Sequence, residues 1–188
     1  NEHMVLEILK NEITEIKNKF GDERRTSIEP VEDDIDIEDL IAEEDNVITM
    51  THQGYIKRLA VDTYKSQKRG GKGIIGMQTK EEDFIDTMFV ASTHAHILFF
   101  TNTGRMYRLK TYEIPEAGRQ AKGTAIVNLL QLEAGEKISA MIPIREYEEN
   151  HFLIMATRNG IIKKTDIMEY KNAPKGGKIA INLDEGDE

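Results

Sequence analysis

The residues with the clearest capacity for chemistry are seven consecutive positions in which cations are interspersed with glycines. They are Gln67, Lys68, Arg69, Gly70, Gly71, Lys72 and Gly73. Glycine lets the backbone turn tightly, arginine grips phosphate oxygens with a planar fork, and lysine adds a mobile point charge. The spacing does not fit a nucleotide P-loop, because Ser66 stands where that motif needs its first glycine. The string therefore indicates either a phosphate-binding loop or an ordinary solvated basic loop.

The composition is that of a globular protein with a hydrophobic core. The chain has 188 residues, 39% of them hydrophobic, and no cysteine, which excludes disulfides and thiolate metal sites and fits a reducing cytoplasm. No apolar run approaches the roughly 20 residues that a membrane-spanning helix requires. We therefore expect a cytoplasmic protein with no membrane partner.

The net charge of -9 is unevenly distributed along the chain. Residues 1–46 hold 5 Lys or Arg against 16 Asp or Glu, whereas the remaining 142 residues hold 20 against 18. Residues 51–80 carry seven cations and a single acid, Asp62. The acidity is therefore local, and the stretch around the basic loop has the charge expected of a nucleic-acid-binding surface.

The seven-residue string resembles the gyrase-A box, the motif of the C-terminal DNA-wrapping domain in the DNA gyrase A family. All seven positions fit that pattern. The resemblance extends over essentially the whole chain and is most specific at residues 67–73. It implies a β-pinwheel, a six-bladed relative of the β-propeller in which neighbouring blades exchange strands.

The first 21 residues predict a helix. Leu6, Leu9, Ile13, Ile16 and Phe20 are spaced 3, 4, 3 and 4 apart, which is the seam of a coiled coil or the apolar face of an amphipathic helix. Gly21 stands where a helix C-cap would be. By resemblance, residues 1–21 are the end of the coiled-coil arm of the gyrase-A breakage-reunion domain.

Residues 22–46 predict an acidic linker, because nine of the fourteen positions from 32 to 45 are Asp or Glu. The apolar residues Ile35, Ile37, Leu40 and Ile41 lie within it. We expect them to anchor the linker to the following domain as a short strand or a turn of helix. The acidic run could also compete with DNA for the basic loop, although a solvated linker is the simpler interpretation.

An internal repeat begins at residue 47 and predicts a mainly β fold. Three segments align without gaps: VITM-THQGYIKR at 47–58, ILFF-TNTGRMYR at 97–108, and LIMA-TRNGIIKK at 153–164. Each predicts an apolar strand, a T-x-x-G turn at Gly54, Gly104 or Gly160, and a strand that ends in cations. Asn159-Gly160 is a favoured type I′ hairpin dipeptide.

Two weaker copies of the basic loop occur in register with it, at residues 117–123 (AGRQAKG) and 173–179 (APKGGKI). A second hairpin is expected after each copy, at residues 132–138 and 183–188. Because the last of these stops before its partner strand, we expect the sequence to end inside a repeat, with an apolar residue next in the natural chain. Repeats of about 50 residues with several short strands are typical of propeller blades. Residues 47–188 therefore predict a partial pinwheel of about three blades out of six.

The box is the first candidate DNA-binding site, and the cations in the repeats are candidates for extending it. These further residues are Lys57, Arg58, Arg105, Arg108, Arg119, Lys122, Lys163, Lys164, Lys175 and Lys178. For each of them a solubilising charge at a strand end is an equally good interpretation. No segment resembles a helix that reads a DNA groove, so we expect binding without base readout.

The resemblance also implies properties of a larger assembly. DNA gyrase is an ATP-hydrolysing type II topoisomerase that introduces negative supercoils. It contains two copies each of the gyrase A and gyrase B proteins, with ATP bound on gyrase B and Mg²⁺ in the cleavage site. The catalytic tyrosine lies in a domain that these residues do not include. We therefore expect no catalytic residue, cofactor or metal in this chain itself.

Three other interpretations are open. The first is the related C-terminal domain of topoisomerase IV, a decatenase whose box is usually degraded. The second is a propeller scaffold that binds acidic proteins. The third is a metal site at His94 and His96, which a strand would place on one face, although no third ligand lies nearby in sequence.

Overall fold

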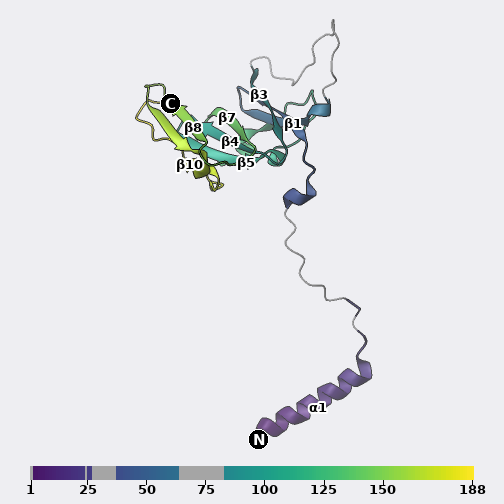
Figure 1. The fold of residues 1–188 in the computed structure, drawn as a ribbon. Helices are drawn as coiled ribbons and strands as arrows, with labels where there is room; N and C mark the ends of the chain where they lie inside the picture. The colour runs from purple at the N-terminus through teal and green to yellow at the C-terminus, as the bar shows by residue number, and fades with distance from the viewer. Residues whose placement is uncertain (1, 24, 27–36, 64–82) are drawn as a thin grey trace. The chain divides into compact units, whose positions relative to one another are not determined.

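The computed structural model describes residues 2–23, 25–26, 37–63 and 83–188. Its contacts divide the chain into two units, residues 1–36 and residues 37–188 (Figure 1). The first contains one helix and the second contains all the described strands. The basic string at 67–73 lies outside the described residues.

The predicted N-terminal helix is present as α1 (Glu2–Phe20). None of its residues is buried, and the seam residues are all exposed, with Phe20 at 71% of its full accessibility. The backbone N–H of Gly21 donates to the Lys17 carbonyl oxygen at 2.7 Å and continues the helical hydrogen-bonding pattern at its end. The helix thus has an amphipathic pattern in which the apolar seam residues are exposed.

The acidic segment reaches the β unit through a 3₁₀ turn, η1 (Ile37–Leu40). A turn of helix was expected here, but its apolar residues do not anchor it, since Ile37 and Leu40 are 69% and 75% exposed. Instead, the Lys110 ammonium donates to Glu38 Oε1 at 2.8 Å. The segment is thus held by this ion pair and by contacts to its backbone, such as that from Thr93 Oγ1 to the Ala42 carbonyl oxygen, rather than by burial of Ile37 and Leu40.

The three predicted hairpins are present. In each, two antiparallel strands flank the T-x-x-G turn: β1 (Asp45–Thr51) with β2 (Tyr55–Ala60), β4 (His96–Thr101) with β5 (Arg105–Lys110), and β8 (Phe152–Ala156) with β9 (Ile162–Asp166). Gly54, Gly104 and Gly160 have φ values of 82°, 76° and 87°. Left-handed backbone of this kind favours glycine, which explains why the turn repeats that residue.

The type I′ prediction for Asn159-Gly160 was wrong. A type I′ turn needs positive φ at both central residues, but among the described non-glycine residues only Asn150 has a positive φ. Strands β8 and β9 pair from Ala156 and Ile162 onward, so the loop has five residues rather than two.

The sheets are completed by strands from the following repeat. Strand order is β3-β1-β2-β6 in the first sheet and β10-β5-β4-β7 in the second. The remaining strands are β3 (Ile85–Ser92), β6 (Thr124–Ala125), β7 (Ile138–Ile144) and β10 (Lys178–Ile179). Thus β6 follows the second hairpin but pairs with the first, and β10 follows the third but pairs with the second. This exchange confirms the β-pinwheel prediction.

The hairpin expected at residues 132–138 is not a hairpin. Residues 132–137 do form a turn, but the strand that follows it, β7, pairs with β4, while the preceding strand, β6, pairs with β2. Exchange between repeats therefore replaces local pairing. Short 3₁₀ segments follow several strands: η2 (Val61–Thr63), η3 (Thr111–Glu113), η4 (Ile126–Asn128) and η5 (Ile167–Tyr170).

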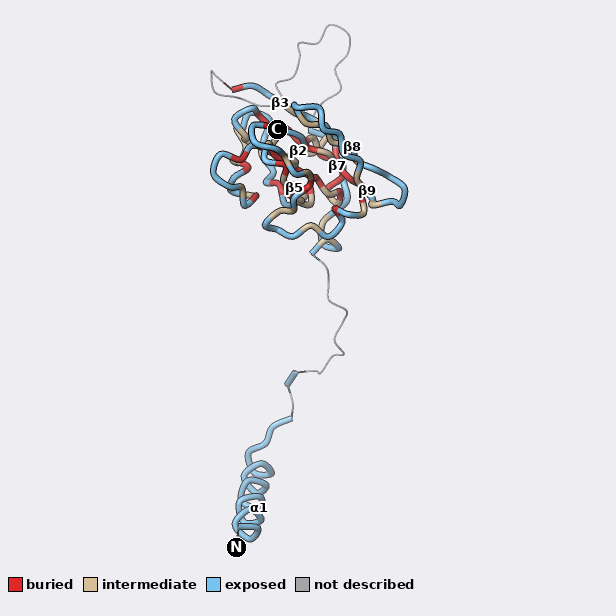
Figure 2. Tube along the Cα trace, turned by 90° about the vertical axis from the view of Figure 1, so that its left-hand side faces the viewer, coloured by how far each residue is buried: buried red, intermediate tan, exposed pale blue. Residues whose placement is uncertain are grey.

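Two apolar clusters form the core, and β4 separates them. Ile97 and Phe99 belong to the cluster shared with the first sheet, whereas Leu98 belongs to the cluster shared with the third repeat. Successive side chains of a strand point to opposite faces, so β4 is buried on both. Figure 2 shows the buried residues gathered among the strands and the exposed residues along α1. This packing holds β2 and β5 in place, and the two weaker copies of the basic loop lie along the edges of these strands.

Candidate nucleic-acid interface

The two weaker copies show how a basic loop lies on this fold. The copy at 117–123 runs along β2, the edge of the first hairpin, since the N–H of Ala117 donates to the Arg58 carbonyl oxygen at 3.1 Å and Ile56 pairs with Thr124. The backbone of Gly123 has φ +83°, and a Cβ there would lie 2.5 Å from the Ile56 carbonyl oxygen. Glycine is therefore required at the end of this copy.

Lys57 was predicted to contact DNA, and this prediction was wrong. The exposed fraction of Lys57 is 0%. Its Nζ donates to the carbonyl oxygens of Gly118 and Arg119 at 2.9 Å and of Ala121 at 3.0 Å. Burial lowers the pKa of its ammonium group. An ammonium enclosed in this way cannot reach a phosphate, because the loop itself occupies its three donors.

The sequence carried one signal of this inward position. The repeat alignment places Lys57 in register with Tyr107, and a tyrosine at that strand position suggests a side chain facing the core. The equivalent Lys163 is different again, because it is exposed and its Nζ donates to the Ala180 carbonyl oxygen at 2.6 Å.

The copy at 173–179 lies along β5, the edge of the second hairpin. Lys178 pairs with Met106 in the β10–β5 ladder, and Arg105 Nη2 donates to the Gly176 carbonyl oxygen at 2.6 Å. Gly177 has φ +83°, and a Cβ there would lie 2.7 Å from Tyr107 Cε1. The Tyr107 ring thus faces the copy at 173–179, in the position from which Lys57 faces the copy at 117–123.

Two predicted arginines, one within β2 and one within β5, also bind loop carbonyl groups. Arg58 Nε donates to the Ile114 carbonyl oxygen at 2.8 Å, and Arg108 donates to the Lys171 carbonyl oxygen. The sequence offered these cations as candidate DNA contacts or as solubilising charges, whereas in the structure they hold the next segment against the strand. A guanidinium with several donors can still offer one outward.

The remaining predicted cations lie nearer the surface. Arg119, Lys164 and Lys175 are exposed, while Lys122 and Lys178 are partly covered. Lys122 Nζ lies 3.7 Å from the centroid of the Tyr55 ring, and Lys164 Nζ lies 3.9 Å from that of Phe152. Cations on aromatic faces keep their charge at the surface with their stems ordered. These five predicted cations keep a charge at or near the surface, where a polyanion could meet it.

The two candidate metal-binding histidines do not form a site. His94 lies in the turn before β4 rather than on the strand, and its Nε2 is 2.7 Å from the Ile41 carbonyl oxygen. His96 packs edge-on against the Tyr147 ring, with centroids 5.5 Å apart, and burial lowers the pKa of His96 to about 4. Within the described ranges, no three His, Cys, Asp or Glu residues are grouped as a metal site would need.

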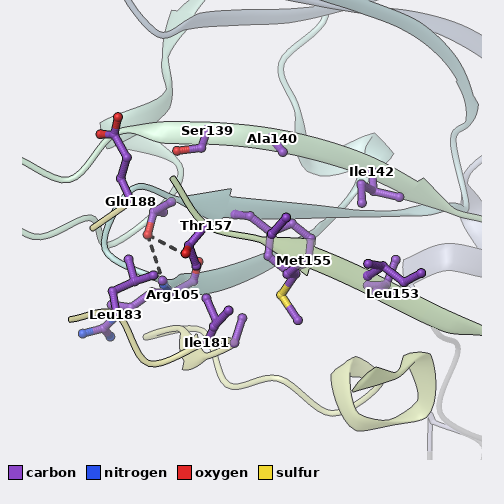
Figure 3. A pocket seen from close by; sticks show the side chains of 16 residues that line it. Arg105, Ser139, Ala140, Ile142, Leu153, Met155, Thr157, Ile181, Leu183 and Glu188 are labelled. Carbon is purple, nitrogen blue, oxygen red and sulfur yellow. Dashed lines mark hydrogen bonds between the residues drawn. The ribbon is translucent and has the colours of Figure 1, made fainter. Parts of the chain in front are cut away.

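A pocket of about 240 Å³ lies between the second sheet and β8 (Figure 3). Ile142, Leu153 and Met155 line one part of it, and Arg105 and Glu188 lie towards another. Its lining is largely aliphatic and contains no nucleophile and base in hydrogen-bonding contact. The pocket lies where residues of the second and third repeats pack against each other.

Comparison with known proteins identifies the fold family. The family model described as "DNA gyrase C-terminal domain, beta-propeller" matches residues 45–92, 95–145 and 151–188. The chain belongs to this family. Each of the three matched segments contains one of the T-x-x-G hairpins, so the family's repeat and the repeat in the structure coincide.

The curated relatives are DNA gyrase A proteins by name. The chain is 62% identical over 188 residues to that of Clostridium acetobutylicum, and the match covers 100% of this chain and 23% of the relative. It is 54% identical to that of Halalkalibacterium halodurans, over 98% of this chain and 22% of the relative. The chain therefore spans less than a quarter of the length of these relatives.

Solved structures of both enzyme types resemble the chain. The C-terminal domain of DNA topoisomerase IV matches with a TM-score of 0.66 and 30% identity, covering 78% of this chain and 44% of that one. The DNA gyrase A C-terminal domain matches with a TM-score of 0.62 and 28% identity, covering 77% and 45%. Separately, no helix among the described residues is long and apolar enough to cross a membrane.

Proposed function

We propose that this chain binds duplex DNA without sequence preference and wraps it, as the C-terminal part of a DNA gyrase A protein. The observation that carries the proposal is the recurrence of basic loops on successive sheets. The copy at 117–123 lies along β2 and the copy at 173–179 lies along β5. With the box at 67–73 they form a series in which each repeat contributes one loop.

The energetics of bending favour such a series over a single loop. Bending 20 to 30 base pairs through 40 to 90° costs on the order of 1 to 6 kcal/mol. A loop with three cations neutralises about three phosphates, whereas several loops on successive blades release counterions along the whole curved path. Lys68, Arg69 and Lys72 anchor the duplex in this proposal, and Arg119 and Lys175 extend the contact.

The proposal also places the chain in a larger enzyme. In this proposal the parent protein is part of an ATP-hydrolysing type II topoisomerase, assembled from two gyrase A and two gyrase B proteins in the bacterial cytoplasm. ATP and Mg²⁺ act elsewhere in that assembly, and this chain is not itself catalytic. Its contribution is to wrap DNA in one sense, so that strand passage has a direction.

Plasmid ligation tests the wrapping. A nicked plasmid is closed by ligase with the 188-residue chain present, and the linking number of the product is read on a gel. We expect a positive shift that disappears when Lys68, Arg69 and Lys72 are all changed to Ala. The matched control changes Lys10, Lys17 and Lys19 of α1 to Ala, which removes the same charge and leaves the shift in place.

Two outcomes would contradict the proposal. A shift that persists in the box variant would show that the box does not anchor the wrap. Binding with no salt dependence would favour a protein scaffold, because DNA affinity falls by roughly 0.9 log unit per log unit of salt for each neutralised phosphate.

A topoisomerase IV function is the second candidate, supported by the 30% identity and TM-score of 0.66 to that C-terminal domain. It predicts salt-dependent DNA binding with no linking-number shift that depends on the box. The same ligation assay therefore separates the two candidates.

A further inference from the structure

The side chain of Lys57 has an environment that neither the core nor DNA contact explains. It lies on β2, fully buried, and its Nζ meets the carbonyl oxygens of Gly118, Arg119 and Ala121 at 2.9, 2.9 and 3.0 Å. An ammonium has three donors, so each N–H has one acceptor. Burying a charge is costly unless its donors are satisfied, and here one loop supplies all three acceptors.

This arrangement gives the loop its shape. Three carbonyl groups from four successive residues converge on one nitrogen, and the N–H of Ala121 closes a turn onto the Gly118 carbonyl oxygen at 3.0 Å. With the Arg119 carbonyl directed at Lys57, its side chain remains exposed at the surface. The inward lysine and the outward arginine are thus coupled through one peptide unit.

We propose that Lys57 is a positioning residue that holds the 117–123 copy in the conformation from which Arg119 contacts a DNA phosphate. The inference rests on the DNA-binding function proposed above. Without the clamp, a loop rich in small residues would be ordered only on binding DNA, and that loss of entropy would weaken the contact. Lys57 acts on DNA through the loop and never touches it.

The chain offers a matched control at the equivalent position of the third repeat. Lys163 aligns with Lys57, carries the same charge and bonds to a carbonyl group as well, that of Ala180 at 2.6 Å. Its side chain is exposed, and it lies outside the contacts that hold residues 118–121. Lys163→Met therefore makes the same chemical change at a position that does not hold residues 118–121.

Salt titrations of DNA binding test the coupling. The affinity for a labelled duplex is measured by fluorescence anisotropy over a range of salt for the wild type, Lys57→Met, Arg119→Ala and the double variant. Both single changes are expected to make the negative slope of log affinity against log salt shallower by roughly 0.9, the value for one phosphate contact. The double variant is expected to match either single variant.

Additive losses would overturn the inference. If Lys57 and Arg119 each held a phosphate independently, the double variant would lose roughly 1.8 from the slope. A Lys57→Met slope equal to that of the wild type would also overturn it. A wild-type chain without salt-dependent binding would overturn the proposed function itself, together with the part of this inference that depends on it.

Limited trypsin digestion tests the clamp without DNA. Cleavage after Arg119 is expected to be faster in Lys57→Met than in the wild type, because the freed loop fits a protease more readily. Lys163→Met is expected to leave cleavage at Arg119 unchanged. Equal cleavage rates in Lys57→Met and the wild type would contradict the clamp.

The wild type alone provides a further test if Lys57→Met does not fold. Hydrogen exchange at the Ala121 amide, which donates to the Gly118 carbonyl oxygen, is expected to be on the order of 100-fold slower than in an unstructured peptide. Exchange at the unstructured rate would mean that the loop is not held, and would overturn the inference.

Discussion

The two copies of the basic loop occupy equivalent strand edges but are held by different chemistry. The copy at 117–123 surrounds the ammonium of Lys57, which binds three carbonyl groups. The copy at 173–179 packs its Gly177 against the Tyr107 ring, with Arg105 bound to one carbonyl group. A repeat can therefore conserve the placement of a loop while exchanging a polar clamp for an aromatic one.

Removal of the aromatic support has the largest expected effect. Tyr107 is fully buried, and its hydroxyl donates to Glu136 Oε2 at 2.8 Å. Tyr107→Ala should lower the free energy of unfolding by about 3 to 5 kcal/mol, as for other large-to-small core changes. Tyr107→Phe keeps the ring and should cost only about 1 to 3 kcal/mol, through the loss of one hydrogen bond to the Glu136 carboxylate. Urea unfolding measures both, and equal losses would show that the hydroxyl, not the ring, supports the copy.

The glycines of the two copies should show the next largest effect. Gly123→Ala puts a Cβ 2.5 Å from the Ile56 carbonyl oxygen, and Gly177→Ala puts one 2.7 Å from the Tyr107 ring. Each adds a clash to the roughly 1 to 2 kcal/mol that left-handed backbone costs an alanine. Gly135→Ala is the control, because it has φ +84° with open space around its Cβ position. Denaturant midpoints equal to that of Gly135→Ala would refute the close approach.

Acid should weaken the support of the second copy through Glu136. Burial raises the pKa of this carboxyl, but hydrogen bonds from Glu133 N–H, Thr101, Tyr107 and Thr103 outweigh burial and lower it below the usual value. The ionised carboxylate thus stabilises the fold above its unfolded pKa of about 4.3, and the contribution is lost as pH falls through the lower folded pKa. Melting temperatures between pH 7 and 3 should fall less steeply in Glu136→Gln, and parallel curves would contradict this.

The smallest effect is expected at the rim of the second copy. Lys178 Nζ lies 3.3 Å from Glu169 Oε2, in an ion pair at the surface where Glu169 is exposed and Lys178 is partly covered. Glu169→Gln should change the free energy of unfolding by less than about 0.5 kcal/mol, because exposed ion pairs contribute little. It should nevertheless strengthen DNA binding slightly, since Lys178 loses a competing carboxylate. Weaker binding in anisotropy titrations would argue against Lys178 as a contact.

Much of the fold could be predicted because its information is local. The T-x-x-G turns recur at Gly54, Gly104 and Gly160, and each lies between the two strands of a hairpin as the repeat predicted. The heptad spacing likewise predicted α1. These signals depend on residues within a few positions of one another, where backbone sterics and side-chain periodicity decide the outcome.

The partners of the cations could not be predicted because they come from the next repeat. Lys57 and Gly118 are bonded but lie 61 positions apart, and nothing in a single strand shows that a lysine faces inward. The expected hairpin at 132–138 failed for the same reason, since β6, the strand before the turn, pairs with β2 of the preceding repeat. Where contacts are long-range, composition alone cannot distinguish a buried cation from an exposed one.

Strand exchange has a consequence for synthesis on the ribosome. Ile56 pairs with Thr124, so the first sheet lacks its outer strand until about 68 more residues have been made. At 5 to 20 residues per second, this delay is about 3 to 14 seconds. During that interval the edge of β2 is open to pairing with other nascent chains. The basic side chains Lys57 and Arg58 on that edge, one of them later buried, would then act as a charge barrier against premature association.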